Sequence, residues 1–205
     1  MTPIDVIIIG GGAGGLSCGI TLASAHQKSW FDDRRIVVVD DDRSDLNQAL
    51  LNNAPGIPMG TTGTMLLETM RQQLAAFPVA SLVEARALRV RRHPESGFEV
   101  ALDNGTTPRC LTVVLATGYK RWELEGLSTD PCRHPRGGKP TRLAFDHDEA
   151  YCMESDLYVA GLLAGGSSQF AIASGIGAQV AVEILSGWAG KRTHVHDVPV
   201  PDKSS

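Results

Sequence analysis

The beginning of the chain holds the feature that most limits its fold: an apolar run followed at once by a block of glycines. Residues 4–9 read IDVIII, and a continuous β-branched run of this length is typical of a strand buried on both faces of a parallel sheet. GGGAGG occupies 10–15, and the apolar stretch at 16–25 predicts a helix. The order strand, glycine turn, helix favours an α/β fold built on a parallel sheet.

The glycines have the G-x-G-x-x-G spacing of a dinucleotide-binding turn, at Gly10, Gly12 and Gly15. In such a turn the first glycine permits a tight bend, the second lets the backbone approach a pyrophosphate, and the third lets the helix pack on the strand. Asp40 ends a second apolar run, 36–39, where a carboxylate can accept hydrogen bonds from ribose hydroxyls. This pattern predicts a dinucleotide site without choosing between FAD and NAD. A glycine turn without a ligand, and a solvated acidic turn at 40–42, are the alternatives.

Two stretches of the chain contain no charged residue, Val6–Ala25 and Leu157–Val182. Each is long enough to cross a bilayer. They contain six and five glycines, however, and glycine-rich helices are weak. The N-terminus also carries Asp5 instead of the basic head of a signal peptide. We therefore expect two buried strand–loop–helix units, and neither a membrane span nor a secretory signal.

The segment between these units predicts one more helix and several short strands. An amphipathic helix is expected over Thr64–Phe77, and β-type alternation over Val79–Leu102 is broken at Pro94–Gly97. Asn104-Gly105 is a strong hairpin signal, so we expect an antiparallel meander that begins at Val79 and leads into the next buried strand. That strand and the closing elements are expected at Leu111–Ala116, at Leu157–Ala160, and as a helix over Phe170–Ser186.

These elements predict a Rossmann-like three-layer α/β fold, with a parallel sheet, helices on one face and a small antiparallel β-meander on the other. At 205 residues the chain is too short for two complete nucleotide-binding folds, and we expect one domain over 1–190 and a tail over 191–205. Lys and Arg number 19 against 23 Asp and Glu, a net charge of −4 without a basic block. This balance argues against a nucleic-acid partner.

The four cysteines form no CxxC and no zinc-like pairing with histidine. They are typical of reduced thiols in a cytoplasmic protein. Two histidines in the tail, His194 and His196, are too few for a metal site, and no metal is expected. Cys18 and Cys110 fall on or beside predicted elements, whereas Cys132 and Cys152 lie in a loop-rich region where they could meet in space.

Later motifs extend the pattern beyond a single glycine turn. VVLATG at Val113–Gly118, LYVAG at Leu157–Gly161 and a following QFA that opens a glycine-bearing helix resemble the FAD-binding domain of thioredoxin-reductase-like proteins, a branch of the pyridine nucleotide-disulfide oxidoreductases. NNAPGIP at 52–58 resembles their N-x-P-G segment. The resemblance runs over nearly the whole chain. It implies bound FAD, a second helix N-terminus beside the flavin ring, a homodimer and a cytoplasmic location.

The resemblance also implies which residues contact the cofactor, position by position along the matching motifs. It gives no catalytic residue in this chain, because the chemistry belongs to the flavin. The implied FAD-binding residues are Gly10, Gly12, Ala13, Gly14, Gly15, Asp40, Asp41, Arg43, Asn53, Ala85, Ala116, Thr117, Gly118, Gly161, Leu162, Gln169, Phe170 and Ala171.

Two departures from the family pattern matter for function. Thioredoxin reductases insert an NADPH domain with a redox CxxC between the ATG strand and the last strand, but here only the 38 residues of Tyr119–Asp156 fill that interval. Leu162 also stands where the family has an aspartate that binds the ribityl chain. The basic residues of this interval, such as Arg133, His134 and Arg136, either keep a loop in solution or form an electron-donor or substrate surface.

The sequence therefore predicts an FAD-dependent oxidoreductase that lacks its own NADPH domain and CxxC. Such a protein would be reduced by a partner protein, or by a small-molecule or thiol substrate. The alternative is a non-catalytic flavin- or nucleotide-binding module or subunit. No contact with nucleic acid or membrane is expected.

Overall fold

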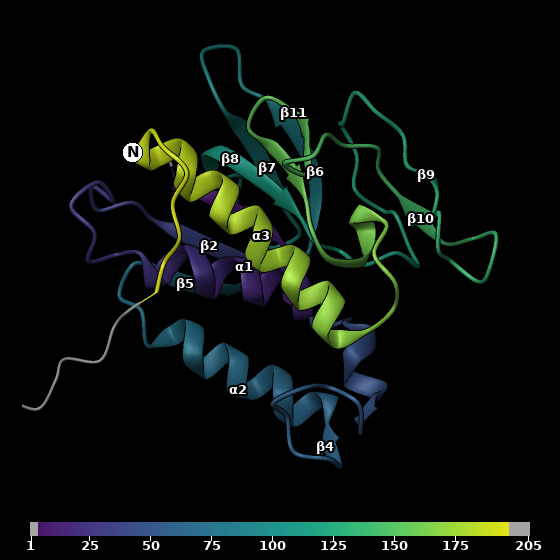
Figure 1. Ribbon diagram of the computed structural model, residues 1–205. Helices are drawn as coiled ribbons and strands as arrows, with labels where there is room; N and C mark the ends of the chain where they lie inside the picture. Colours follow the sequence, from purple (N-terminus) through teal and green to yellow (C-terminus); the bar gives the residue numbers. More distant parts are fainter. Residues whose placement is uncertain (1–3, 197–205) are drawn as a thin grey trace, which may run out of the picture.

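The computed structural model describes residues 4–196 of the chain (Figure 1). Most of the predicted tail at 191–205 therefore lies outside the described residues. Within that range, five parallel strands form the centre of the sheet in the order β12-β8-β1-β2-β5. Their bounds are Ile4–Ile9 for β1, Ile36–Asp40 for β2, Ala80–Glu84 for β5, Arg109–Leu115 for β8 and Leu157–Val159 for β12.

Strand β1 occupies the middle of the sheet, as its apolar sequence predicts. It pairs with β2 through Val6 and Ile36 and with β8 through Ile7 and Val113. Alternate side chains of β1 enter the two cores of the molecule, Val6 and Ile8 on one face and Ile7 and Ile9 on the other. All four are at most 4% exposed. Burial on both faces explains why the strand has no polar alternation.

Three helices cover one face of the sheet: α1 (Ala13–Ser24), α2 (Gly63–Ala75) and α3 (Phe170–Ala189). Their apolar side chains share one core with Val6 and Ile8. Helix α1 begins three residues before the predicted start, inside the glycine block. The glycines are required there because an added Cβ on Gly15 would overlap the carbonyl of Gly10.

The opposite face carries the predicted antiparallel meander of β6 (Ala87–Arg92), β7 (Phe98–Leu102) and the first part of β8. Gly105 turns the chain between β7 and β8 with a φ of +83°. Val90 and Val100 pack under β1 in the second core. The three-layer arrangement predicted from the sequence is thus confirmed.

One strand of the predicted meander was assigned to the wrong layer. β5, expected as the first antiparallel strand, pairs in parallel with β2 from Ile36 and Ala80 onward and forms the edge of the main sheet. Helix α2 connects β2 to β5, and such a crossover returns the chain in the parallel direction. Alternation of polar and apolar residues is the same for a parallel edge strand and a meander strand, so the period alone could not separate them.

The 38-residue interval after β8 contains little regular structure. A hairpin joins β9 (Cys132–Arg133) to β10 (Leu143–Ala144), and β11 (Cys152–Glu154) runs antiparallel to β12 at the sheet edge. Figure 1 shows the β9–β10 hairpin projecting from the body of the molecule. The remaining short elements are β3 (Leu50–Leu51), β4 (Thr61–Thr62) and 3₁₀ turns at Asp45–Gln48 and Gly161–Ala164.

Helix α3 is the one helix in the described part of the chain that is long and apolar enough to cross a membrane, judged by length and composition alone. In the structure it packs along α1. An added Cβ on Gly177 would overlap the carbonyl of Gly14, and one on Gly14 would lie 2.7 Å from the Cα of Gly161. Three backbone segments therefore meet at these glycines, where a side chain would not fit.

Candidate functional site

A cavity of about 640 Å³ lies beyond the carboxyl ends of β1, β2 and β8. Ligands of open parallel sheets bind in this position, and the volume falls within the range of small-molecule pockets. All of the predicted FAD-binding residues line the cavity except Gly15 and Ala171. The structure thus brings together residues that are more than 150 positions apart in the sequence.

The three fingerprint glycines have different surroundings. Gly10 has a φ of +111°, and a Cβ there would lie 2.5 Å from the carbonyl oxygen of Ala116. Gly15 packs against Gly10 and does not line the cavity. A Cβ on Gly12 would meet only the side chain of Ser44, at 3.1 Å. Gly10 and Gly15 are therefore required by the fold, whereas Gly12 keeps space open in the cavity.

Two helices direct uncapped N-termini at the cavity. Helix α1 follows Gly12 and α3 follows Gln169, and neither has a side-chain cap or an acidic residue in its first turn. Helix α2 differs, because the hydroxyl of its N-cap Thr62 accepts a hydrogen bond from the Met65 amide at 3.3 Å. Unsatisfied N–H groups and the helix dipole favour an anion at the ends of α1 and α3.

Asp40 lies at the end of β2 and is 5% exposed. Its Oδ1 accepts hydrogen bonds from the amides of Gly11 at 3.1 Å and Asp42 at 3.3 Å. Its Oδ2 accepts from Arg71 Nη2 of α2 at 3.0 Å, and the same nitrogen bonds Asp42 at 2.6 Å. The hydrogen bonds from Arg71 and from Asn47 hold the pKa of Asp42 below its ordinary value. Asp40 therefore holds the glycine turn in place, and its contact with a ribose stays a prediction.

Ion pairs connect two segments that both line the cavity. Arg43 bonds Asp41 at 2.6 Å and Glu123 at 3.1 Å, and the bond to Asp41 is the main reason that the pKa of Arg43 is raised. Lys120 pairs with Asp45 at 2.5 Å. The loop after β2 and the start of the interval after β8 are joined in this way at one side of the cavity.

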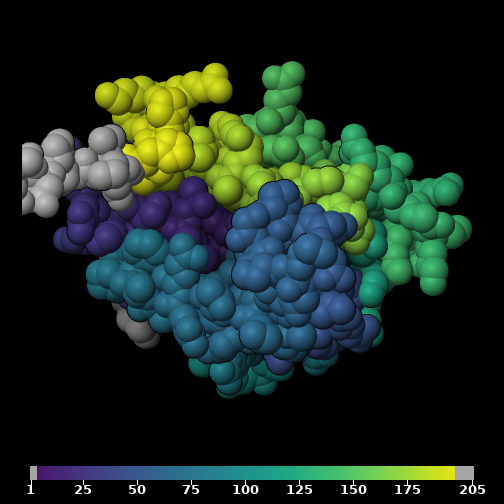
Figure 2. Space-filling model, turned by 60° about the horizontal axis from the view of Figure 1, so that its bottom comes forward, coloured from purple at the N-terminus to yellow at the C-terminus, as the bar shows by residue number. Residues whose placement is uncertain are grey.

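The other end of the cavity is formed by the start of α3 and by the loop around Asn53. Asn53 Nδ2 donates a hydrogen bond to Gln169 Oε1 at 3.2 Å. Figure 2 shows the segment around residues 45–62, in blue, against the beginning of α3 in yellow-green. Leu162, which replaces the family aspartate, lines the cavity and is half-buried. This end therefore lacks a carboxylate at that position.

The interval after β8 fixes the turn that carries Leu162. Three carbonyls of this turn accept a hydrogen bond from the interval, which restrains the backbone directly beside the cavity. The bonds run from His134 Nε2 to Leu162 at 2.9 Å, from the Phe145 amide to Leu163 at 3.0 Å and from Arg136 Nη1 to Gly165 at 2.7 Å. The Ala164 carbonyl between them lies 3.1 Å from His147 Nε2, whose other ring nitrogen lies 2.7 Å from the Asp148 carbonyl.

His134 is central to this restraint. It is 2% exposed, its Nδ1 accepts from the Arg136 amide at 3.0 Å, and Nε2 therefore carries the proton donated to Leu162. Its ring also contacts Tyr119 edge-on, and Tyr119 lines the cavity. Both sequence interpretations are wrong for His134 itself, because a buried ring neither keeps a loop in solution nor forms a surface for a donor or substrate.

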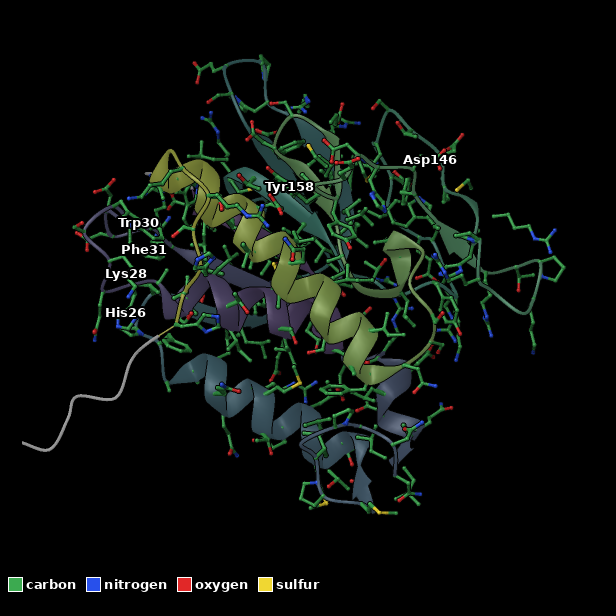
Figure 3. All side chains as sticks on the ribbon, in the orientation of Figure 1. His26, Lys28, Trp30, Phe31, Asp146 and Tyr158 are labelled. Carbon is green, nitrogen blue, oxygen red and sulfur yellow. The ribbon has the colours of Figure 1, made fainter. Side chains whose placement is uncertain are left out.

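The four cysteines are free thiols. The Cys132 thiol faces the Asp146 carboxylate at 3.8 Å (Figure 3), and the Cys152 thiol donates to the Glu154 carbonyl at 3.0 Å. Burial raises the pKa of Cys110 to about 12 and that of Cys18 still further. Burial, followed by nearby acids, also raises the pKa of Cys132 and Cys152. None of the four has the lowered pKa typical of a reactive cysteine.

Comparison with known proteins gives a consistent picture of the fold. No family model matches the chain. Ferredoxin–NADP reductase 1 of Listeria welshimeri is 28% identical over 123 residues, which are 60% of this chain. The chain spans 37% of the length of that relative. A thioredoxin reductase from Gloeobacter violaceus superimposes with a TM-score of 0.74 at 15% identity, covering 97% of this chain and all of that one.

An atypical thioredoxin reductase from Desulfovibrio vulgaris Hildenborough gives a TM-score of 0.71 at 16% identity, over 91% of this chain and 98% of its own. The chain has a thioredoxin-reductase-like fold. The resemblance recognised in the sequence is therefore confirmed at the level of the Rossmann-like FAD-binding fold.

The residues around the cavity of this thioredoxin-reductase-like chain fit FAD in most respects. Gly12 leaves room for a pyrophosphate, and a Cβ there would enter that room. The uncapped ends of α1 and α3 offer N–H groups to negative charge at two places along one cavity. Leu162 is the exception, since it offers no hydrogen bond to a ribityl hydroxyl.

Sequence reasoning missed several residues that shape the site. Gly11 and Arg71 hold Asp40, and His134, Arg136 and His147 contact the Leu162 turn. Gly11 had a local signal, its place inside the glycine block. The other four residues contact groups that are 17 to 31 positions away in the sequence. Nothing in the sequence next to them indicates which group that is.

Proposed function

We propose that this protein is an FAD-dependent oxidoreductase. The observation that carries the proposal is the pair of uncapped helix N-termini, on α1 and α3, that open into one cavity beside the fingerprint turn. A plain nicotinamide-binding unit needs only the first of them. The second suits the flavin ring, because a helix N-terminus stabilises negative charge on the reduced ring.

In this proposal the residues of the cavity bind and orient FAD. The amides at the start of α1 bind the pyrophosphate, and the Asp40–Arg43 segment adjoins the adenosine. Gln169 and Phe170 contact the flavin side, and the Leu162 turn excludes water there. When bound, FAD supplies the electron transfer that no side chain of this chain can supply. Our proposal also includes a cytoplasmic location and a homodimer, as the resemblance implies.

We propose further that the electrons come from a small carrier protein of the ferredoxin class. The interval 119–156 contains no glycine fingerprint, and the described part of it contains no helix that could bind the pyrophosphate of a nicotinamide nucleotide. The Listeria relatives are named ferredoxin–NADP reductases, which supports a carrier of this kind. The proposed acceptor is a protein or small-molecule disulfide. Two reduced carriers and two protons from solvent balance its conversion to two thiols.

The test begins with the absorbance spectrum of the purified protein. We expect a flavin spectrum, and heat should release FAD identified by chromatography; release of NAD(H) would overturn the cofactor assignment. Under anaerobic conditions, chemically reduced ferredoxin should bleach the flavin within seconds. Excess NADPH or NADH should do so far more slowly, because orientation of the nicotinamide contributes several kcal/mol to hydride transfer. Bleaching by NADPH within milliseconds would overturn the proposed donor.

A second candidate is a non-catalytic flavin-binding module. Leu162 in place of the family aspartate favours it, because loss of a ribityl contact is compatible with a static cofactor. The same experiment separates the two functions. A protein that contains FAD but is bleached by neither ferredoxin nor nicotinamide nucleotides, and whose flavin no disulfide reoxidises, is a binding module.

A further inference from the structure

The hairpin between β9 and β10 has a charge opposite to that of the whole chain. Within 131–145, which we call the basic hairpin, there are four cationic residues and no aspartate or glutamate, although the chain carries a net charge of −4. The cationic residues are Arg133, Arg136, Lys139 and Arg142. This short projection thus carries four of the chain's 19 basic side chains and no acid of its own.

These charges face solvent and are not neutralised by acids. Arg133, Arg136 and Lys139 are exposed, and Arg142 is half-buried. In the described part of the chain, no carboxylate lies within ion-pair distance of any of the four. Arg71, Arg89 and Arg109, by contrast, each pair with an acid. Asp130 and Asp146 flank the basic hairpin in the sequence, but neither forms an ion pair with it in the described structure, so Arg133 and Lys139 keep their charges unpaired at the surface.

The basic hairpin is attached to the flavin side of the cavity. His134 and Arg136 bond the carbonyls of Leu162 and Gly165, as described above. The Leu143 amide donates to the Tyr119 carbonyl at 2.8 Å, and the Arg142 guanidinium lies 4.9 Å from the centre of the Tyr119 ring. Leu162 and Tyr119 both line the cavity. A partner seated on the hairpin is held next to that end.

We propose that the basic hairpin is the docking surface for an acidic electron-carrier protein. This inference rests on the proposed function, and it names the place where the carrier binds. A positive projection on a negatively charged body attracts an acidic partner to one face and repels it from the rest, which sets both the encounter rate and the orientation. The two-residue strands and the lack of a helix in the hairpin make it a poor site for a nucleotide pyrophosphate.

The experiment measures binding of a purified bacterial ferredoxin to the FAD-loaded protein by calorimetry, at about 0.05 M and about 0.3 M salt. The test variant is Arg133→Glu/Lys139→Glu, which changes two exposed side chains that bond no other side chain in the described structure. The matched control is Arg91→Glu/Lys191→Glu, which makes the same change in net charge at exposed positions on β6 and after α3. Flavin content and unfolding temperature of each variant report whether the fold is intact.

We expect the hairpin variant to weaken ferredoxin binding about tenfold or more at low salt, and the control to change it by less than about threefold. The difference should shrink at high salt. Equal weakening by both variants, or no ferredoxin binding by the unchanged protein while FAD is bound, overturns the docking surface but leaves the flavoprotein assignment. A protein that binds no FAD overturns the proposed function, and the docking inference with it.

Discussion

The two ends of the cavity are built in different ways. At the phosphate end, where we propose that the pyrophosphate binds, the turn and the start of α1 lie within the first fifteen residues, and the backbone itself provides the N–H groups. At the flavin end, where we propose that the flavin binds, Asn53 bonds Gln169 across 116 positions, and His134 bonds Leu162 across 28. A turn built from backbone groups suits any dinucleotide, whereas the flavin end depends on contacts between distant segments of the chain. We therefore expect the binding properties that distinguish this protein from other dinucleotide-binding proteins to depend on the flavin end.

The largest effect should come from the phosphate end. Gly12→Val fills the space for the pyrophosphate, and we expect FAD affinity to fall about a hundredfold or more, since such an overlap costs about 3 kcal/mol. Flavin content and FAD titration of the apo protein measure this. The control is Gly175→Val on α3, where an added Cβ meets nothing within 4 Å. If Gly12→Val keeps normal flavin content, the glycine turn binds no phosphate.

At the flavin end, Leu162→Asp should tighten FAD binding. The new carboxylate restores the ribityl contact of the family, and a charged hydrogen bond contributes about 1.5–3 kcal/mol, or roughly a ten- to hundredfold gain. Titration of FAD into the apo forms of both proteins decides the outcome, with Leu162→Asn as the uncharged control. Weaker binding by the aspartate variant would mean that the turn places position 162 against an apolar part of the cofactor.

His134→Ala removes the side chain that restrains the Leu162 turn. We expect the unfolding free energy to fall by about 1–3 kcal/mol, because buried hydrogen-bonding groups lose a partner, and FAD affinity to fall about tenfold. His26→Ala is the control: His26 Nδ1 contacts the Ala23 carbonyl at 3.1 Å at the end of α1 (Figure 3), away from the cavity-lining residues. It should lower stability without changing FAD affinity. Equal affinity loss in both variants would assign the effect to general destabilisation.

The smallest effect concerns the ion pair between Lys120 and Asp45. Breaking it with Lys120→Asp should speed FAD release about two- to fivefold, because exposed pairs contribute about 0.2–1 kcal/mol. The exchanged variant Lys120→Asp/Asp45→Lys should restore slow release, and salt should abolish the difference. Stopped-flow release of FAD into an excess of an FAD-specific apo-oxidase, which captures the free cofactor, measures the rate. A double variant as fast as the single one would show that the pair does not close the cavity.

The difference between the two ends also explains what could be predicted from the sequence. The fingerprint, the central strand and the helices α1 and α3 follow from local pattern, and their positions were predicted within a few residues. Strand β5 was placed in the meander because its alternation does not report which neighbour it pairs with. Pairing direction depends on the path of the chain through α2, which no window of a few residues contains.

The residues of the site show the same difference between those that a local pattern predicts and those that it does not. The fingerprint glycines could be assigned because their spacing is a local pattern, and the cavity collects nearly all of the predicted residues. Arg71 and His134 could not be assigned, because a polar residue becomes a structural partner only when a distant segment packs against it. Two of the three hydrogen bonds that restrain the Leu162 turn come from the side chains of His134 and Arg136, in an interval without periodicity.

The meeting of Gly14, Gly161 and Gly177 has a consequence for synthesis of the protein. Gly14 leaves the ribosome early, but its packing partners belong to the last strand–helix unit, 147 and 163 positions later by sequence number. Until α3 has emerged, the first turn of α1 has no neighbour on that side, and the nascent chain offers only half of a nucleotide pocket. The pocket therefore stays incomplete until α3 has been synthesised, and a cofactor can be enclosed only by a chain that already contains both strand–helix units.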